Sequence, residues 1–454
     1  MEALPAEWQQ FHLDPVGLEF LRDWLRMSAL RETGWKLVTY PPEHALKMPS
    51  PVTLSLNVTE QCNIACTYCY FSGGYGGNRG HNASVLSRRV TERALQRFFK
   101  ESDQTAPTCL YFFGGEPLLA LPQIRHALEL AENVGITAVK AVASNGMLLN
   151  EAAVTLFEKH EVYLAISIDG PNHDEARVRR NGSGTLRCVE ERLEWLLTSH
   201  PEFLRRRVST SCVVDAGTDL VSLYYYFQSS AALREVVHWD FDIILAGLGD
   251  GGLFGFPDQS LELLVDWYMD FVTLPDASAP DEVFWRYFFA SGFNVIHRTF
   301  WSAATRGAAR KQPDTVRGPL GTIDPPGSSM ITVRPNGELV AGNERQKASY
   351  VVGSVDAGTD PVRVHELARR FERMVDCMQC RLCWAAPMCT LTLSDFDIDD
   401  CSTPMLDSDL THYHQRCVLE RRLIKAFADR LSDLSSDARR NCNSFLGNEL
   451  EAMP

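Results

Sequence analysis

Six short apolar runs recur between residues 52 and 245, and helix-like segments separate most of them. The runs are rich in branched and aromatic residues and have the length of single strands: 52–58, 108–113, 138–143, 162–168, 207–214 and 236–245. Apolar residues recur at helical spacing in the first two intervening segments: Ala94, Leu95 and Phe98, then Ile124, Ala127, Leu128 and Ala131. Strands that alternate with helices predict parallel pairing, and therefore an α/β fold.

The rest of the chain follows other patterns. Residues 1–50 combine one amphipathic helix with a short strand over 35–40, which is less than a winged-helix peptide-binding module needs. Residues 246–320 begin with glycines that do not follow the dinucleotide-binding arrangement and continue as an aromatic, helix-like stretch. We therefore expect an N-terminal extension (1–50), an α/β unit (51–245), a helical connector (246–320) and a C-terminal domain (321–454).

Composition narrows the classes of function. The chain has 454 residues, 45% of them hydrophobic and 22% charged, and no apolar run approaches the roughly 20 residues of a membrane span. Its first residues, MEALPAEWQQF, lack the basic and then apolar pattern of a signal peptide. The net charge of −14 argues against a nucleic-acid partner bound through its phosphates. We expect a cytoplasmic protein without nucleic-acid or membrane partners.

The loop after the first strand carries the clearest chemistry. In TEQCNIACTYCY, Cys62, Cys66 and Cys69 form CxxxCxxC, which lets one loop place three thiolates around one face of an iron-sulfur cube. Three ligands leave the fourth iron open to a substrate, unlike four-cysteine ferredoxins or tetrahedral zinc knuckles. The alternative is three buried or metal-binding cysteines without redox chemistry.

With Tyr68, this loop reads CxxxCxYC and resembles the cluster loop of the radical S-adenosylmethionine (SAM) enzymes. The resemblance implies a [4Fe-4S] cluster on Cys62, Cys66 and Cys69, whose free iron binds the amino and carboxylate groups of SAM. It also implies a partial (β/α)6 barrel with the chemistry at the carboxyl ends of the strands.

Two further motifs follow the second and third strands. Gly114, Gly115, Glu116 and Pro117 resemble the family's GGEP motif, which receives the SAM amino group. Ser144 and Asn145, followed by glycine, resemble the family's (S/T)NG element near SAM. Without the strands before them, both motifs would be ordinary turns.

The fourth strand ends in a run that resembles the subgroup of anaerobic sulfatase-maturing enzymes and peptide maturases. The run reads SIDGP from Ser167, with a basic pair at Arg179 and Arg180 before GSGT. The resemblance implies that Ser167 and Arg180 contact the SAM carboxylate or ribose, and that Asp169 has a catalytic role toward the substrate. The alternative is that Asp169 caps a helix and that the arginines are solvated.

Six cysteines gather near the C-terminal end of the chain: Cys377, Cys380, Cys383, Cys389, Cys401 and Cys417. Auxiliary iron-sulfur clusters or a structural zinc site would explain such a density. Cys380, Cys383 and Cys389 reproduce the CxxCxxxxxC of the SPASM domain, and Cys417 resembles its last ligand. Cys377 and Cys401 are surplus to that pattern and are further candidate ligands.

Two positions depart from the SPASM pattern. Gly342 follows a hairpin-like stretch, ITVRPNGELVAG, where the pattern has its first cysteine, and Leu393 stands where CxxxC would end. Neither side chain can bind iron. We therefore expect one auxiliary [4Fe-4S] cluster and two clusters in all.

The resemblance implies a radical SAM oxidoreductase that acts as a peptide maturase. We expect it to crosslink a ribosomally synthesised precursor peptide oxidatively, through carbon-carbon or thioether bonds. Alternatives are a formylglycine-generating sulfatase maturase, a peptide epimerase and a non-catalytic Fe-S protein that binds a peptide. The expected partners are the precursor peptide and a low-potential electron donor such as flavodoxin or ferredoxin; a separate leader-peptide-binding protein is left open.

Overall fold

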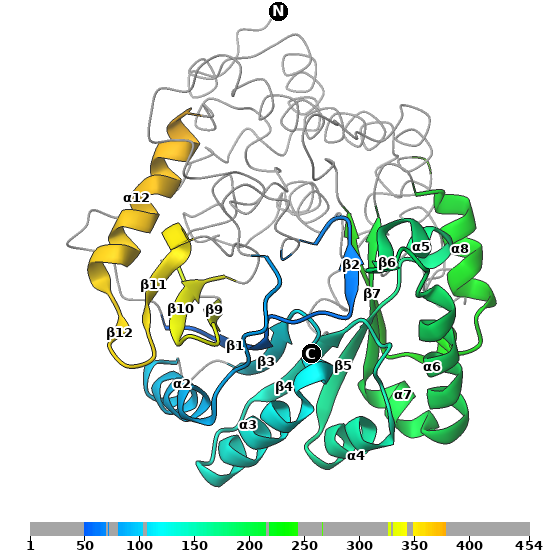
Figure 1. Cartoon of the computed structure of the whole chain (residues 1–454), viewed down its shortest axis with the longest axis horizontal. Helices are drawn as coiled ribbons and strands as arrows, with labels where there is room; N and C mark the ends of the chain where they lie inside the picture. The colour runs from blue at the N-terminus through cyan, green and yellow to red at the C-terminus, as the bar shows by residue number, and fades with distance from the viewer. Residues whose placement is uncertain are drawn as a thin grey trace, which may run out of the picture.

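The structure is a computed structural model, and its fold is organised around one ten-stranded sheet (Figure 1). The structure describes residues 50–69, 71, 80–102, 107–214, 218–243, 266, 326–327, 330–342 and 348–377. Within these ranges the strand order is β12-β11-β10-β9-β1-β3-β4-β5-β7-β8. The predicted N-terminal extension and nearly all of the predicted connector lie outside the described residues.

Six neighbouring parallel strands form the larger part of the sheet. They are β1 (Thr53–Thr59), β3 (Cys109–Gly114), β4 (Val139–Ser144), β5 (Val162–Ser167), β7 (Val208–Val214) and β8 (His238–Ile243). Each lies within two residues of a predicted strand at both ends. The sheet does not close, because the free edge of β1 pairs with β9 rather than with β8. The prediction of a partial (β/α)6 barrel is confirmed.

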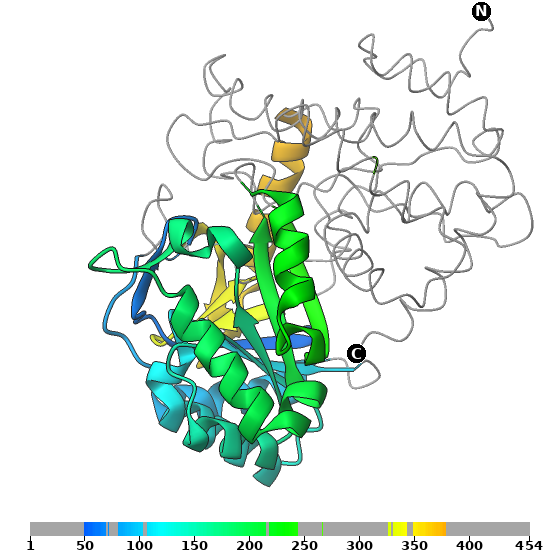
Figure 2. The same ribbon diagram turned by 90° about the vertical axis from the view of Figure 1, so that its right-hand side faces the viewer.

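Helices cover one face of these strands (Figures 1 and 2). They are α2 (Arg88–Glu101), η3 (Pro117–Ala120), α3 (Leu121–Asn133), α4 (Glu151–Lys159), α6 (Leu186–Ser199), α7 (Pro201–Arg207), α8 (Leu220–Ser229) and η5 (Leu233–Glu235). The side chains of Ser87, Asn150 and Asp219 cap α2, α4 and α8 by accepting hydrogen bonds from first-turn amides. The apolar faces predicted for α2 and α3 are buried.

Successive residues of β3, β5 and β7 alternate between a buried and a partly exposed face. Phe112, Ile166 and Cys212 are fully buried on the side that the helices cover, whereas Tyr111 and Ala165 on the opposite side keep part of their surface. Successive side chains of a strand point to opposite faces, so the outer layer is tightly packed and the inner face of these three strands is partly accessible. On β1, Ser55 and Asn57 of the inner face are fully buried.

Four further strands extend the sheet beyond β1. They are β9 (Met330–Val333), β10 (Glu338–Ala341), β11 (Val351–Ser354) and β12 (Gly358–Thr359), followed by α12 (Pro361–Cys377), with η6 (Ala348–Tyr350) before β11. Because β9 pairs in parallel with β1, residues predicted to open the C-terminal domain continue the sheet of the barrel.

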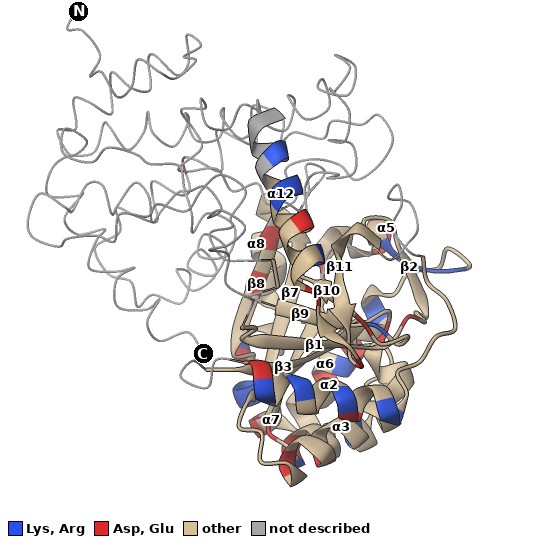
Figure 3. Ribbon diagram, turned by 90° about the vertical axis from the view of Figure 1, so that its left-hand side faces the viewer, with Lys and Arg blue, Asp and Glu red and all other residues tan. Residues whose placement is uncertain are grey.

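Side chains of α2 form hydrogen bonds and an ion pair with the residues that follow β11. Its exposed face is basic (Figure 3), and the Arg97 guanidinium donates to the carbonyl oxygens of Val355 and Asp356 over 3.2 and 3.3 Å. Arg89 forms an exposed ion pair with Asp356 over 3.1 Å.

Among the described residues, no helix is both long and apolar enough to cross a membrane.

Candidate active site

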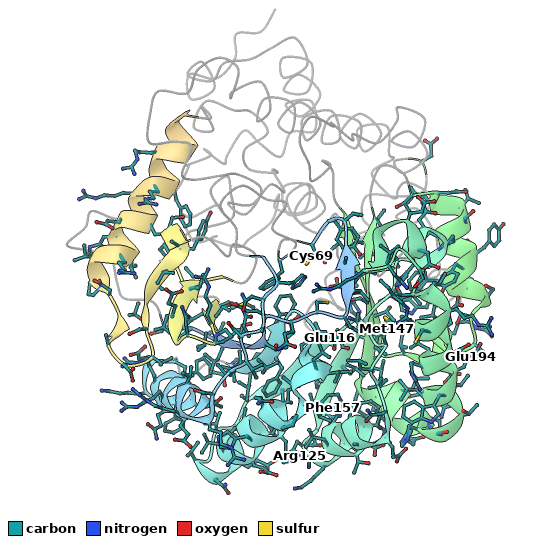
Figure 4. All side chains as sticks on the ribbon, viewed as in Figure 1. Cys69, Glu116, Arg125, Met147, Phe157 and Glu194 are labelled. Carbon is teal, nitrogen blue, oxygen red and sulfur yellow. The ribbon has the colours of Figure 1, made fainter. Side chains whose placement is uncertain are left out.

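The cysteine loop follows β1 at the carboxyl end of the parallel sheet. Its short strand β2 (Ile64–Cys66) pairs antiparallel with β6 (Arg177–Arg179), which follows β5 after η4 (Gly170–Asn172) and α5 (His173–Ala176). Figure 4 shows Cys69 and Glu116 at this edge, whereas Phe157 and Arg125 lie toward the opposite edge. The loop is therefore held between the first and fourth strands of the barrel.

The three thiols of this loop suit an iron-sulfur cluster. Cys62, Cys66 and Cys69 are thiols rather than disulfides, and they are partly exposed. Burial raises the pKa of Cys62 to about 12 and that of Cys66 to about 11, so their thiolates need the positive charge of bound iron. No three of the described metal-binding side chains converge on a single ion. A cubane does not require this, because each thiolate binds a different iron.

The GGEP turn lies directly on the backbone of the cysteine loop. The amide of Gly115 donates to the Thr59 carbonyl over 2.8 Å, and the amide of Glu116 donates to the Gln61 carbonyl over 2.7 Å. A Cβ atom on Gly114, whose φ is +131°, would lie 2.2 Å from the Thr59 oxygen, and one on Gly115 would lie 2.0 Å from the Gln61 oxygen. Both glycines are needed for this close approach.

The carboxylate of Glu116 joins the GGEP turn to the third barrel strand. It is 1% exposed and accepts hydrogen bonds from the Leu118 amide (2.9 Å), the Ser144 hydroxyl (2.8 Å) and the Asn145 amide (2.8 Å). The pKa of Glu116 is raised overall, because the effect of burial outweighs the three hydrogen bonds that lower it. Because both oxygens are engaged within the protein, the carboxylate organises the site, and an incoming ammonium group would have to compete with these donors.

Asn145 also connects this turn to the cysteine loop. Its side-chain amide donates to the Asn63 side-chain oxygen over 2.7 Å, next to Cys62. Pro117 opens η3 and is buried. The GGEP and (S/T)NG motifs predicted from the sequence thus meet the cysteine loop at one place.

Asp169 forms a buried link between the loop and the sheet. It is 4% exposed and accepts hydrogen bonds from the Tyr68 hydroxyl (2.5 Å), Arg177 (2.8 Å) and the Val213 amide (2.9 Å). Arg177 also lies over the Tyr68 ring, 5.2 Å from its centroid, and its positive charge lowers the pKa of Cys66 against the effect of burial. These contacts hold the Tyr68 end of the loop against β7, and the catalytic role expected of Asp169 from the sequence stays a prediction.

His173 hydrogen-bonds to the main chain of Asp169 and to Thr185, next to this link. Its Nδ1 accepts from the Asp169 amide over 3.1 Å, and its Nε2 lies 2.9 Å from the Thr185 hydroxyl, which itself donates to the Arg177 carbonyl over 2.7 Å. Nε2 therefore carries the proton. Burial lowers the pKa of His173 to about 4, which keeps the ring neutral.

The remaining predicted residues have varied positions. Ser167 ends β5 on the inner face, and Arg180 donates to the Cys62 carbonyl over 3.4 Å. Sequence reasoning missed Arg177, because no local pattern separates it from the neighbouring arginines; only its burial and its pairing with Asp169 do so.

The auxiliary-cluster residues lie mostly outside the described part of the chain. This holds for Cys380, Cys383, Cys389, Cys401 and Cys417, while Cys377 ends α12 with its side chain outside the description. Gly342 follows β10 with a φ of +82°, and a Cβ atom there would meet nothing within 4 Å. The number of auxiliary clusters stays a prediction.

Comparisons with known proteins agree with this site. Residues 56–208 match the model of the radical SAM superfamily. The chain is 32% identical over 148 residues to an uncharacterized protein of Synechocystis, covering 30% of this chain and 36% of that protein. It is 25% identical over 201 residues to a serine-type anaerobic sulfatase-maturating enzyme of Bacteroides thetaiotaomicron, covering 42% of this chain and 48% of the enzyme. A cysteine-type enzyme of Clostridium perfringens is 26% identical over 190 residues, covering 40% of this chain and 49% of that enzyme. The matches thus span less than half of each relative.

Solved structures extend the likeness in fold. Native anSMEcpe with bound AdoMet superposes with a TM-score of 0.56 at 18% identity, covering 84% of this chain and all of that one. The same protein with bound AdoMet and the Cp18Cys peptide gives a TM-score of 0.54 at 17% identity, covering 84% of this chain and 99% of that one. At such identities the likeness concerns the fold. With the family match and the cysteine loop, it supports SAM and a [4Fe-4S] cluster as the cofactors. Residues 56–208 thus form a radical SAM domain that is similar to the anaerobic sulfatase-maturating enzymes.

Proposed function

We propose that this protein is a radical SAM enzyme that modifies a side chain of a peptide substrate. The observation that carries the proposal is the junction of the CxxxCxYC loop with the GGEP turn, at the carboxyl edge of an open, parallel sheet. When bound, SAM and the reduced cluster supply a 5'-deoxyadenosyl radical that abstracts hydrogen from an unactivated carbon. The protein itself contributes binding, orientation and exclusion of water.

The residues divide this work among them. Cys62, Cys66 and Cys69 would hold the cluster, and the Asp169–Arg177 pair holds the loop against the sheet. Glu116 holds the GGEP turn in a fixed position through its hydrogen bonds to Ser144 and Asn145, and this turn would receive the SAM amino group. The partly exposed inner face leaves room for the substrate.

Within this class, we favour oxidative crosslinking of a ribosomally synthesised peptide. Its support is the departure of Gly342 and Leu393 from the SPASM pattern, which suggests one auxiliary cluster where the sulfatase-maturing pattern has two. The second candidate is formylglycine formation on a sulfatase. It is supported by the names of the relatives from Bacteroides and Clostridium.

The deciding experiment follows peptide mass and 5'-deoxyadenosine together. Anaerobically reconstituted protein, a low-potential reductant such as flavodoxin, and SAM are mixed with the short peptide encoded beside the gene or with a sulfatase peptide. Loss of hydrogen with a new interresidue fragment supports crosslinking, whereas a product that reacts with hydroxylamine supports formylglycine. Deuterium uptake from solvent without any other mass change would indicate epimerisation. No deoxyadenosine from the wild type, at the level of a Cys66→Ser control, would refute an enzymatic role.

Iron and sulfide analysis tests the number of clusters separately. Reconstituted protein with two cubane clusters should contain about eight irons, and about twelve would contradict the assignment of one auxiliary cluster.

A further inference from the structure

Two aspartates of β8 face the inside of the barrel. The register of β7 with β8 places Asp240 beside Ser211 and Asp242 beside Val213. Ser211 and Val213 are the partly exposed residues of β7, whereas the alternate residues of that strand are buried under the helices. Asp240 and Asp242 therefore leave the sheet on its inner face, at its last parallel strand.

Two aromatic rings lie on the opposite wall. Tyr111 and Phe113 occupy the inner face of β3, with ring centroids 5.4 Å apart and planes inclined by 26°. In a flat sheet, the four spacings from β3 to β8 would separate the two strands by roughly 19 Å. Yet the pKa of Tyr111 is raised, first by burial and then by the negative charges of Cys109, Asp242 and Asp240. Tyr111, Asp240 and Asp242 thus share the inner face of the open sheet, and the charges of the two aspartates act on Tyr111 across that interior.

A buried amide on the same face lacks a hydrogen-bond partner. Asn57 of β1 pairs in register with Phe113 and is fully buried. Neither its side-chain nitrogen nor its oxygen is hydrogen-bonded. Leaving a buried amide unsatisfied is unfavourable, so the site favours a ligand that can both donate to it and accept from it. A peptide main chain has both groups.

We propose that the inner face binds a peptide segment containing a lysine or arginine, whose cationic side chain lies between Asp240, Asp242 and the rings of Tyr111 and Phe113. A cation is attracted by negative carboxylates and by the faces of aromatic rings, and this site offers both kinds of group. Asn57 then hydrogen-bonds to the main chain of the same peptide. This inference rests on the proposed function for the choice of a peptide as ligand.

Fluorescently labelled model peptides test this assignment. Three acetylated pentapeptide amides, identical except for a central lysine, norleucine or glutamate, are titrated by fluorescence polarisation into the anaerobically reconstituted protein with SAM bound. We expect the wild type to prefer lysine over norleucine by about tenfold, and to bind the glutamate peptide most weakly. The double variant D240N/D242N should bind the lysine and norleucine peptides equally.

Glu194→Gln provides the matched control, because Glu194 is an exposed carboxylate on the outer helix α6 (Figure 4). This variant should keep the full preference for lysine. If the double variant does not fold, the single variants D240N and D242N should each lose part of the preference. An unchanged preference in the aspartate variants, or none in the wild type, would overturn the assignment. Weaker SAM binding by the double variant with its lysine preference intact would do the same, because the aspartates would then serve SAM.

Formation of 5'-deoxyadenosine without peptide separates this inference from the proposed function. SAM cleavage without an aspartate-dependent lysine preference would refute the peptide site and leave the enzymatic proposal standing. The reverse result would support a cation-binding site in a protein that does not cleave SAM.

Discussion

Replacing Glu116 by glutamine tests whether its carboxylate holds the active site together. One carboxylate oxygen accepts hydrogen bonds from the Leu118 amide and the Ser144 hydroxyl, and the other accepts from the Asn145 amide. Glutamine has the same shape but keeps a single oxygen. Its NH2 group must therefore face at least one donor, and the GGEP turn loses a link to β4.

The expected cost follows from these bonds. A hydrogen bond to a charged group contributes about 1.5–3 kcal/mol, and a buried amide left without an acceptor adds a penalty of similar size. The neutral amide avoids part of the cost of burying a charge, which raises the pKa of Glu116 in the wild type. We therefore expect a net local loss of about 2 kcal/mol, or roughly a 30-fold increase in the opening equilibrium.

Hydrogen exchange measured by mass spectrometry reports this opening directly. Peptides covering residues 114–120 and 142–148 should exchange faster in reconstituted E116Q, while those covering α6 should not change. Glu194→Gln removes an exposed carboxylate from α6 and should leave all rates within about threefold. Equal rates in E116Q and wild type would refute the reasoning, and faster exchange in every peptide would show global unfolding instead.

Three further substitutions probe other parts of the fold. Gly115→Ala places a Cβ atom 2.0 Å from the Gln61 carbonyl and should reduce iron content and visible absorbance after reconstitution, whereas Gly135→Ala, at a positive φ in open space, should not. Since burial lowers the pKa of His173 to about 4, the imidazole is protonated at a higher pH in the unfolded chain than in the folded protein as the pH falls. Stability should be full above pH 6.5 and fall by roughly 3 kcal/mol toward pH 4, and His173→Gln should flatten this part of the urea-midpoint profile. Asn150→Ala removes the cap of α4 and should lower the free energy of unfolding by about 1 kcal/mol in urea titrations, with Asn150→Asp retaining most of it.

Local patterns in the sequence predicted the parallel α/β sheet, and the resemblance of the cysteine loop to a known family added the partial barrel. Most of the parallel strands are short apolar runs, and each early helix has a buried face at helical spacing, so neighbouring residues alone carry these signals. The spacing of Cys62, Cys66 and Cys69 is local in the same way, because one loop supplies all three ligands.

Tertiary structure decided which polar residues work together. Arg177 rather than its neighbours pairs with Asp169, because the β2–β6 pairing turns it toward the cysteine loop. Strand β9 joins β1 across a long stretch of chain, and the order of the parallel strands puts Tyr111 of β3 and Asp240 of β8 on the same inner face. Periodicity reports which side of an element is apolar, but contacts between distant segments depend on how those sides pack, and a single sequence does not encode that packing in any local pattern.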